Sequence, residues 1–161
     1  LTIAQREGGL QRNFQGYSTR RECDLVGLGV SSIGKVGDCY AQNIKDIRTW
    51  QAAVSDGNLP IWRGLSLNTE DRLRRRVIES IMCHGEIDFD RFEDMFAIDF
   101  HEHFAPELDS LKQMEEDGLL SMGGDSFSVT AAGRLLVRNI AMVFDEYLKA
   151  PESAPRFSRV I

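Results

Sequence analysis

Four groups of residues in this sequence have side chains that could bind a ligand or support chemistry. One is a stretch that bears amides and aromatic rings, at residues 13–17, and the next is a glycine-rich apolar run at 25–34. The others are an arginine cluster at 72–76 and a scatter of cysteines and histidines between residues 23 and 103. Each group also has a purely structural interpretation.

The first candidate site is the stretch Asn13-Phe14-Gln15-Gly16-Tyr17. Amide side chains both donate and accept hydrogen bonds, and aromatic rings can stack on a planar ligand. The run Leu25–Ile33 follows, and it is largely apolar without alternation, which predicts a strand covered on both faces, as in a parallel sheet. Its glycines would let a ligand approach the backbone closely. The structural alternative for residues 13–17 is an ordinary polar loop.

The cysteines and histidines do not form a metal-binding pattern. Cys23, Cys39 and Cys83 are an odd and widely spaced set, which indicates a reducing compartment rather than a disulfide framework. In a helix, residues two apart point in different directions, so His101 and His103 make a poor ligand pair. We therefore predict no metal ligands. The two glycines of the Gly27-x-Gly29 pattern are too few for a dinucleotide-binding fingerprint.

The arginine cluster comprises Arg72, Arg74, Arg75 and Arg76. It could bind phosphate or carboxylate groups, or it could be a solvated helix face that pairs with acidic neighbours. Net charge differs between the halves of the chain: residues 1–80 hold 12 Lys and Arg against 9 Asp and Glu, whereas residues 81–161 hold 7 against 16. The acidic second half should repel nucleic acid, so we predict no nucleic-acid partner.

The elements that position these groups are mixed α/β up to residue 66. A short helix is expected over Asp46–Val54 and a strand over Ile61–Leu67. After Asn68 or Thr69, which can cap a helix, the pattern becomes helical. The apolar face of this helix is predicted to hold Leu73, Val77, Ile78, Ile81 and Met82.

The second half predicts more helices and a hairpin. Asp88 caps a short helix, a third helix runs from Asp99 to Asp117 with a break near Ala105, and Gly118 ends it. A hairpin is expected over residues 119–129, with its turn at Gly123-Gly124. Thr130 should cap a closing helix. The predicted inward residues are Phe92, Met95, Phe96, Phe104, Leu108, Leu111, Met114, Leu135, Leu136, Ile140, Val143, Phe144, Tyr147 and Leu148.

Three helices, a hairpin and a closing helix resemble a winged-helix domain. We therefore expect domains at residues 1–66 and 67–150, with a polar tail at 151–161. The 161 residues have 42% apolar and 27% charged side chains, as in soluble globular proteins, and contain no run long enough to cross a bilayer. We expect a cytoplasmic protein without a membrane partner. The chain begins with Leu1 rather than Met, and we expect that it was cut from a longer one.

Several segments resemble one enzyme family in order along the whole chain. They are "LQRNFQGYST", "DLVGLGVSSIG", "GDCYAQN", "WRGLSL", "VTAAGRLLVRNI" and "RFSRVI". They are similar to the C-terminal part of oxygen-independent coproporphyrinogen III oxidases, which are radical S-adenosylmethionine (SAM) enzymes of haem biosynthesis. Related haem chaperones carry Asn-x-x-Tyr-Trp in the corresponding loop. Here no Trp follows Tyr17, which favours the oxidase.

The resemblance implies a fold, a reaction and a set of contacts. The fold would be the end of a partial (β/α) barrel over residues 1–66, followed by a winged-helix-like helical domain. The parent enzyme would use SAM and a [4Fe-4S] cluster to oxidise two propionates of coproporphyrinogen III to vinyl groups, releasing carbon dioxide and giving protoporphyrinogen IX. Ile33 matches a position that contacts SAM, and Phe14 and Gln15 match residues near a second SAM. No radical-generating residue is assigned to this chain.

One departure from the family pattern limits these implications. The family holds its cluster on a CxxxCxxC motif, which this sequence lacks, and the spacing of the three cysteines cannot replace it. We therefore expect the isolated chain to be inactive and to self-associate through residues 1–66. A haem-trafficking protein of the same superfamily and a winged-helix nucleic-acid-binding module remain the alternatives.

Overall fold

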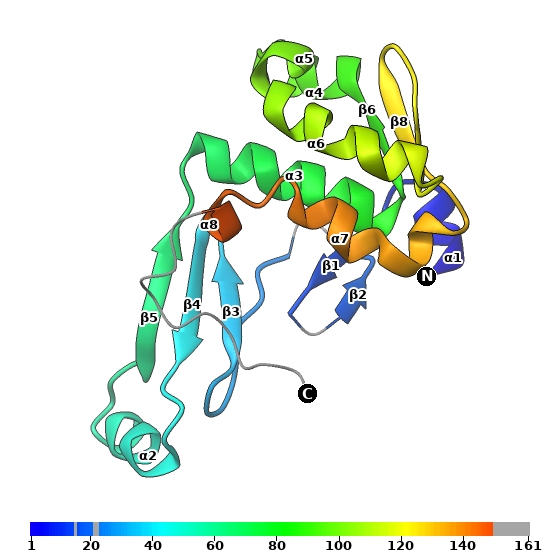
Figure 1. Ribbon diagram of the computed structural model, residues 1–161. Helices are drawn as coiled ribbons and strands as arrows, with labels where there is room; N and C mark the ends of the chain where they lie inside the picture. Colours follow the sequence, from blue (N-terminus) through cyan, green and yellow to red (C-terminus); the bar gives the residue numbers. More distant parts are fainter. Residues whose placement is uncertain (15, 21–22, 150–161) are drawn as a thin grey trace. The chain divides into compact units, whose positions relative to one another are not determined.

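A computed structural model describes residues 1–14, 16–20 and 23–149, and the chain divides into two compact units (Figure 1). The first unit is Leu1–Glu79 and the second is Ser80–Ile161. The predicted tail at 151–161 lies outside the described residues. None of the helices in the described ranges is long and apolar enough to cross a membrane.

The first unit begins with helix α1 (Thr2–Arg6) and a small hairpin. Strands β1 (Gln11–Asn13) and β2 (Gly16–Ser18) pair antiparallel, with Gln11 opposite Ser18. The Gln11 side chain is buried, and its amide donates a 2.7 Å hydrogen bond to the Arg20 carbonyl oxygen. This bond fixes the strand that leads into the 13–17 stretch.

The main sheet of this unit has three antiparallel strands in the order β3-β4-β5. They are β3 (Ile33–Val36), β4 (Cys39–Asn43) and β5 (Ile61–Ser66). Helix α2 (Ile47–Ser55) connects β4 to β5, and the Asp46 carboxylate caps it by accepting a 2.9 Å hydrogen bond from the Thr49 N–H. The predicted helix near residues 46–54 and the predicted strand from Ile61 are thereby confirmed.

The predicted parallel strand over Leu25–Ile33 is wrong. Within the described residues, this run makes a single antiparallel bridge, between Leu25 and Lys35, and strand β3 begins only at Ile33. Gly29 has a φ of 93° and Ser31 a φ of 57°, which are values that extended strands do not adopt. The backbone therefore turns between the two, and the apolar run folds back along β3.

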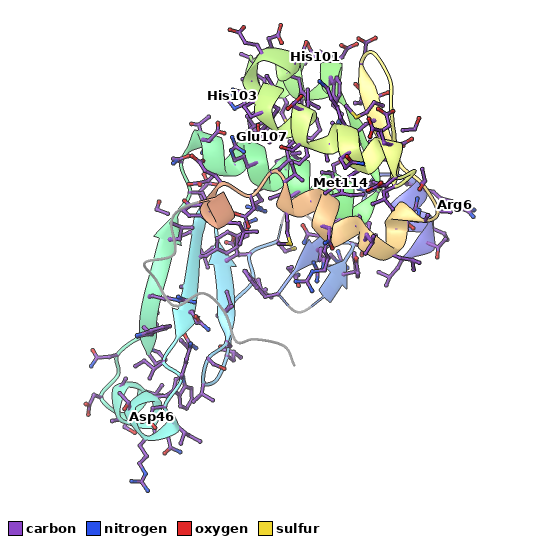
Figure 2. All side chains as sticks on the ribbon, in the orientation of Figure 1. Arg6, Asp46, His101, His103, Glu107 and Met114 are labelled. Atoms are coloured by element: carbon purple, nitrogen blue, oxygen red, sulfur yellow. The ribbon has the colours of Figure 1, made fainter. Side chains whose placement is uncertain are left out.

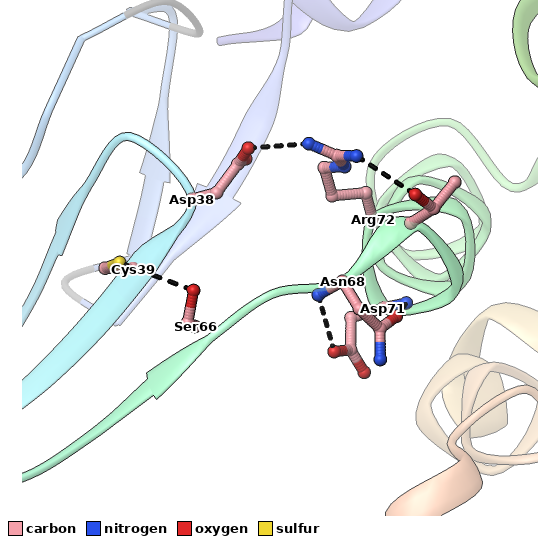
Figure 3. Close-up of polar contacts among 7 residues, drawn as sticks. Asp38, Cys39, Ser66, Asn68, Asp71 and Arg72 are labelled. Carbon is pink, nitrogen blue, oxygen red and sulfur yellow. Dashed lines mark hydrogen bonds and ion pairs between the residues drawn. The ribbon is translucent and has the colours of Figure 1, made fainter.

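Helix α3 (Thr69–Cys83) begins at a reciprocal pair of caps and crosses the boundary between the units. The Asn68 side-chain oxygen accepts from the Asp71 N–H at 2.9 Å, and the Asp71 carboxylate accepts from the Asn68 N–H at 3.0 Å (Figure 3). Its predicted apolar face is confirmed at three positions, since Leu73, Val77 and Ile81 are each at most 2% exposed.

The second unit combines short helices with a second antiparallel sheet. The helices before the hairpin are α4 (Phe89–Phe96), α5 (Phe100–His103) and α6 (Ala105–Glu116). The sheet has the order β6-β8-β7, with β6 (Glu86–Asp88), β7 (Leu120–Met122) and β8 (Ser126–Val129). The break near Ala105, the hairpin and the cap at Asp88 were predicted correctly, whereas β6 was not predicted.

The closing segment is less regular than the single helix that the pattern predicts. It consists of a 3-10 turn η1 (Gly133–Leu136), α7 (Val137–Met142) and α8 (Glu146–Lys149). Ile140 and Phe144 are buried as expected, but Leu135 is 88% exposed, and Leu136 and Tyr147 are also exposed. The interruptions reset the helical period, which moves these side chains off the buried face. Met95 on α4 is likewise exposed rather than inward.

Aromatic rings form the core of the second unit. Phe89 stacks on Phe100 with ring centroids 4.4 Å apart, and Phe104 packs edge-on against Phe144 at 5.4 Å. Phe127 of β8 lies 6.2 Å from Phe144. Rings from two helices, a strand and the closing segment therefore meet in one cluster, which explains why these short elements hold together.

Candidate ligand-binding face

One face of the β3-β4-β5 sheet carries Ile33, which is one of the predicted site residues. Residues directly opposite each other in an antiparallel pair project on the same face, and successive residues alternate. Ile33 is opposite Gln42, Lys35 is opposite Tyr40, and Tyr40 is opposite Leu65 on β5. These side chains share what we call the Tyr40 face, together with Arg63, which is opposite Gln42.

Phe14 extends this face from the β1–β2 hairpin. Its ring meets the Tyr40 ring edge-on, with centroids 5.6 Å apart and planes at 90°. The Phe14 side chain is 58% exposed, so most of it is accessible to a ligand. Two residues predicted to contact SAM, Phe14 and Ile33, therefore lie at the same sheet face, both adjacent to residues of β4. The third, Gln15, lies outside the described residues.

Tyr40 occupies an electrostatic environment set by helix α3. The Arg75 guanidinium carbon is 5.8 Å from the centre of the Tyr40 ring. Burial raises the pKa of the Tyr40 phenol, the nearby positive charge of Arg75 opposes that rise, and the negative charge of Glu79 adds to it. The phenol is therefore neutral at physiological pH and can act as a hydrogen-bond donor.

The other arginines of the cluster are engaged in ion pairs. Arg72 meets Asp38 at 2.8 Å (Figure 3), Arg74 meets Glu70 at 2.5 Å, and Arg76 meets Glu79 at 3.2 Å. The structural interpretation of the cluster therefore holds for three of its members. Arg75 differs, because it contacts a ring and forms no ion pair within the described ranges of the chain.

The glycines that suggested close approach of a ligand are explained by the backbone itself. A Cβ added at Gly34 would lie 2.7 Å from the Leu25 carbonyl oxygen, and one at Gly27 would lie 2.9 Å from the Ile33 carbonyl carbon. The 25–27 segment therefore packs directly on β3. At Gly27 and Gly34 the expectation that the glycines admit a ligand is therefore wrong, because the chain itself already fills that space.

Asn43 holds the turn that brings this segment back to β3. Its amide nitrogen lies 3.1 Å from the Gly27 carbonyl oxygen, 2.9 Å from that of Gly29 and 3.1 Å from the Ser32 hydroxyl. Asn43 was not predicted as a site residue. It is a single amide residue at the end of β4, and such residues are too common to indicate a structural role before the fold is known.

The described residues do not provide a ligand set for a metal ion or an iron–sulfur cluster. Cys23 and Cys39 are exposed and Cys83 is buried, and no group of three potential metal ligands occurs in residues 1–14, 16–20 and 23–149. His101 and His103 both lie on α5 (Figure 2), and the His101 ring nitrogen Nε2 is 2.8 Å from the Gly124 carbonyl oxygen. His101 thus has a structural partner at the hairpin turn.

Comparison with known proteins extends over the whole chain. Residues 67–136 match the family model of the HemN C-terminal domain. The chain is 48% identical over 161 residues to the oxygen-independent coproporphyrinogen III oxidase of Pseudomonas aeruginosa and 44% identical to that of Escherichia coli K12. In both cases the match covers all of this chain and 35% of the relative. The chain therefore spans about a third of the length of these relatives.

A solved structure shares the fold. It is the Escherichia coli coproporphyrinogen III oxidase (HemN), described as a radical SAM enzyme. The match has a TM-score of 0.84 and 45% sequence identity, and it covers 90% of this chain and 33% of that chain. The mixed arrangement of helices and sheets is therefore that of the matching region of this enzyme.

Proposed function

We propose that this chain, which is homologous to the C-terminal part of oxygen-independent coproporphyrinogen III oxidases, serves as that part of such an enzyme. The observation that carries the proposal is the identity of 44–48% to these oxidases across all 161 residues. The parent reaction would convert two propionate side chains of coproporphyrinogen III to vinyl groups. Each conversion releases one carbon dioxide; one hydrogen atom of the propionate would go to the SAM-derived radical, and one further electron would pass to an electron acceptor.

The cofactors of this reaction would be SAM and a [4Fe-4S] cluster, which together supply the radical oxidant when bound. The described residues contain no group of three potential metal ligands, and the sequence lacks the CxxxCxxC motif, so we assign the cluster to parts of the parent enzyme that the matched third does not include. The role proposed for this chain is to bind and orient ligands and to exclude water.

Within that role, we assign SAM contacts to Phe14, Gln15 and Ile33. Support comes from the placement of Phe14 and Ile33 at the Tyr40 face, where an exposed aromatic ring and a half-buried aliphatic side chain adjoin one strand. An adenine ring or a sulfonium methyl group would find apolar contacts there. The neutral Tyr40 phenol offers a polar group beside them.

We also propose that residues 1–66 complete a partial (β/α) barrel in the parent enzyme and that residues 67–150 form a winged-helix-like domain. The second proposal is supported by the order of elements. Helices α3, α4 and α6 precede the β7–β8 hairpin, and β6 pairs with β8 to make a small sheet. This order is typical of winged-helix domains.

A chimeric enzyme tests the proposed function directly. The matching 161 residues of the Pseudomonas aeruginosa oxidase are replaced by this chain, and the product is assayed without oxygen, with SAM, a reductant for the cluster and an added electron acceptor. We expect conversion of coproporphyrinogen III to protoporphyrinogen IX, and a strong loss of it in the double variant Phe14→Ala, Ile33→Ala. A folded chimera with an intact cluster and no conversion would contradict the proposal.

A further inference from the structure

The arginine cluster on α3 contains one member whose surroundings differ from those of the others. Arg72, Arg74 and Arg76 each meet a carboxylate at 2.5–3.2 Å. Arg75 contacts only the ring of Tyr40, at 5.8 Å, and has no carboxylate partner within the described ranges. Three of the four arginines are therefore paired with carboxylates, and the fourth lies beside an aromatic ring.

The position of Arg75 is fixed by the elements around it. It lies in the second turn of α3, whose start is held by the reciprocal caps of Asn68 and Asp71, so its Cα has little freedom. Attraction between a guanidinium group and an aromatic ring holds the side chain over Tyr40. Arg75 is half-buried rather than extended into solvent. It is therefore an ordered cation rather than a mobile surface charge.

An ordered guanidinium without an ion pair is well suited to bind a carboxylate. Arginine presents five N–H donors in a planar fork that matches a carboxylate with two parallel hydrogen bonds. Among the described residues no ion pair occupies these donors, so they are available to a ligand. Partial burial strengthens such a contact, because water competes less for both charges.

We propose that Arg75 binds a carboxylate of a ligand that occupies the Tyr40 face. This inference rests on the proposed function, and it adds a specific binding residue to it. Two ligands of the parent reaction carry carboxylates: the porphyrinogen, through its propionates, and SAM, through its amino-acid end. The Arg75 fork would hold the carboxylate of one of these two ligands, while Phe14 and Ile33 contact the apolar part of that ligand.

The test uses the chimeric enzyme with Arg75→Gln and, as a matched control, Arg72→Gln. The control removes an equal charge three residues away on the same helix. The arginine that it removes is already paired with Asp38. Four probes are titrated: coproporphyrin III, its tetramethyl ester, SAM and decarboxylated SAM. Far-ultraviolet circular dichroism and urea unfolding check that both variants are folded. A third variant, Arg75→Lys, tests whether a positive charge alone is sufficient for binding.

We expect Arg75→Gln to weaken one carboxylate-bearing probe by roughly tenfold or more, as for other charge-assisted hydrogen bonds. If the substitution weakens binding of coproporphyrin III but not of its ester, the group that Arg75 binds is a propionate. If it weakens binding of SAM but not of decarboxylated SAM, that group is the amino-acid carboxylate. Arg72→Gln should leave all affinities within about twofold, and Arg75→Lys should recover only part of the loss because it cannot form the two parallel bonds.

Three results would overturn the proposal: unchanged binding of all probes to Arg75→Gln, equal losses with and without the carboxylate, or an equal loss in Arg72→Gln. These results are distinguishable from failure of the proposed function. An unsubstituted chimera that converts coproporphyrinogen III while Arg75→Gln binds every probe normally refutes only the role of Arg75. An inactive, folded chimera with an intact cluster refutes the function itself.

Discussion

The pKa of the Tyr40 phenol depends on its burial and on two nearby charges. Burial raises this pKa, Arg75 works against that rise, and Glu79 works with it. The folded-state pKa therefore lies above the value in the unfolded chain. This group contributes stability that is fully present below the unfolded pKa and is lost as pH rises through the folded pKa. Stability linked to Tyr40 should thus decline only in strongly alkaline solution.

Removing the Arg75 charge should shift the titration of Tyr40 to higher pH, because the one cause that lowers its pKa is gone. Ultraviolet absorbance titration of Arg75→Gln measures this, with Tyr40→Phe identifying the transition among the three tyrosines. Arg72→Gln, whose charge faces Asp38, should not shift it. A Tyr40 transition that moves to lower pH in Arg75→Gln would show that the guanidinium is not beside the ring.

At the scale of elements, the reciprocal caps at the start of α3 should make a measurable contribution to stability. Asn68→Ala removes the oxygen that accepts the Asp71 N–H, and we expect a loss of about 1 kcal/mol in the free energy of unfolding. Asn58→Ala is the control, because the Asn58 side chain is exposed and has no hydrogen-bond partner among the described residues. Urea unfolding of both variants measures the difference, and equal stabilities would contradict the capping role.

A second element-scale prediction concerns Gly133 at the start of η1. A Cβ there would collide with the Leu119 carbonyl oxygen and crowd Val129 of β8. Gly133→Ala should therefore destabilise the second unit by roughly 1–3 kcal/mol, as overpacking does. Gly124→Ala is the control, since an added Cβ meets nothing within 4 Å there. If both variants unfold at the same urea concentration, the close packing of η1 on the hairpin is wrong.

Elements with a local signal could be predicted from the sequence. Asp46, Asp88 and Thr130 each cap the turn that follows, because a short polar side chain satisfies free N–H groups wherever it precedes a helix. The run Leu25–Ile33 could not be predicted correctly, since its apolar residues suit a strand, and only the positive φ at Gly29 and Ser31 turns it back. Likewise, β6 is three residues long and depends on pairing with β8.

The candidate site was only partly predictable for the same reason. Phe14 and Ile33 were identified through the family resemblance, but nothing local links either to Tyr40 or Arg75. Those contacts depend on sheet register and on a helix about 35 residues further along the chain. A sequence pattern reports neighbours along the chain, whereas this site is formed by residues brought together in the fold.

At the scale of the whole molecule, the cysteines decide whether the 161-residue chain can hold an iron–sulfur cluster alone. Two are exposed, one is buried, and the described ranges contain no group of three potential ligands. We expect anaerobic reconstitution with iron and sulfide to leave the chain without a stable cluster, measured by visible absorbance and by iron content after gel filtration. A stoichiometric cluster that survives gel filtration would contradict this prediction.

The last prediction concerns association between copies of the chain. Among the described residues, β5 pairs only with β4, so its other edge presents free backbone groups. All six of its residues are exposed, including Ile61, Trp62 and Leu65. An exposed apolar edge strand is a template for pairing with another strand. We therefore expect the purified chain to associate as its concentration rises, as measured by sedimentation velocity and solution scattering.

A charge on this strand should oppose that association. Leu65→Lys places a cation on β5, which should reduce the associated fraction at any given concentration because pairing would bury the charge. Met95→Lys adds the same charge at a residue of similar exposure on α4, 46% against 42%, and should leave association unchanged. Two outcomes would contradict the edge-pairing argument: a chain that stays monomeric at every concentration, or equal effects of the two substitutions. The second outcome would assign the association to net charge rather than to the edge of β5.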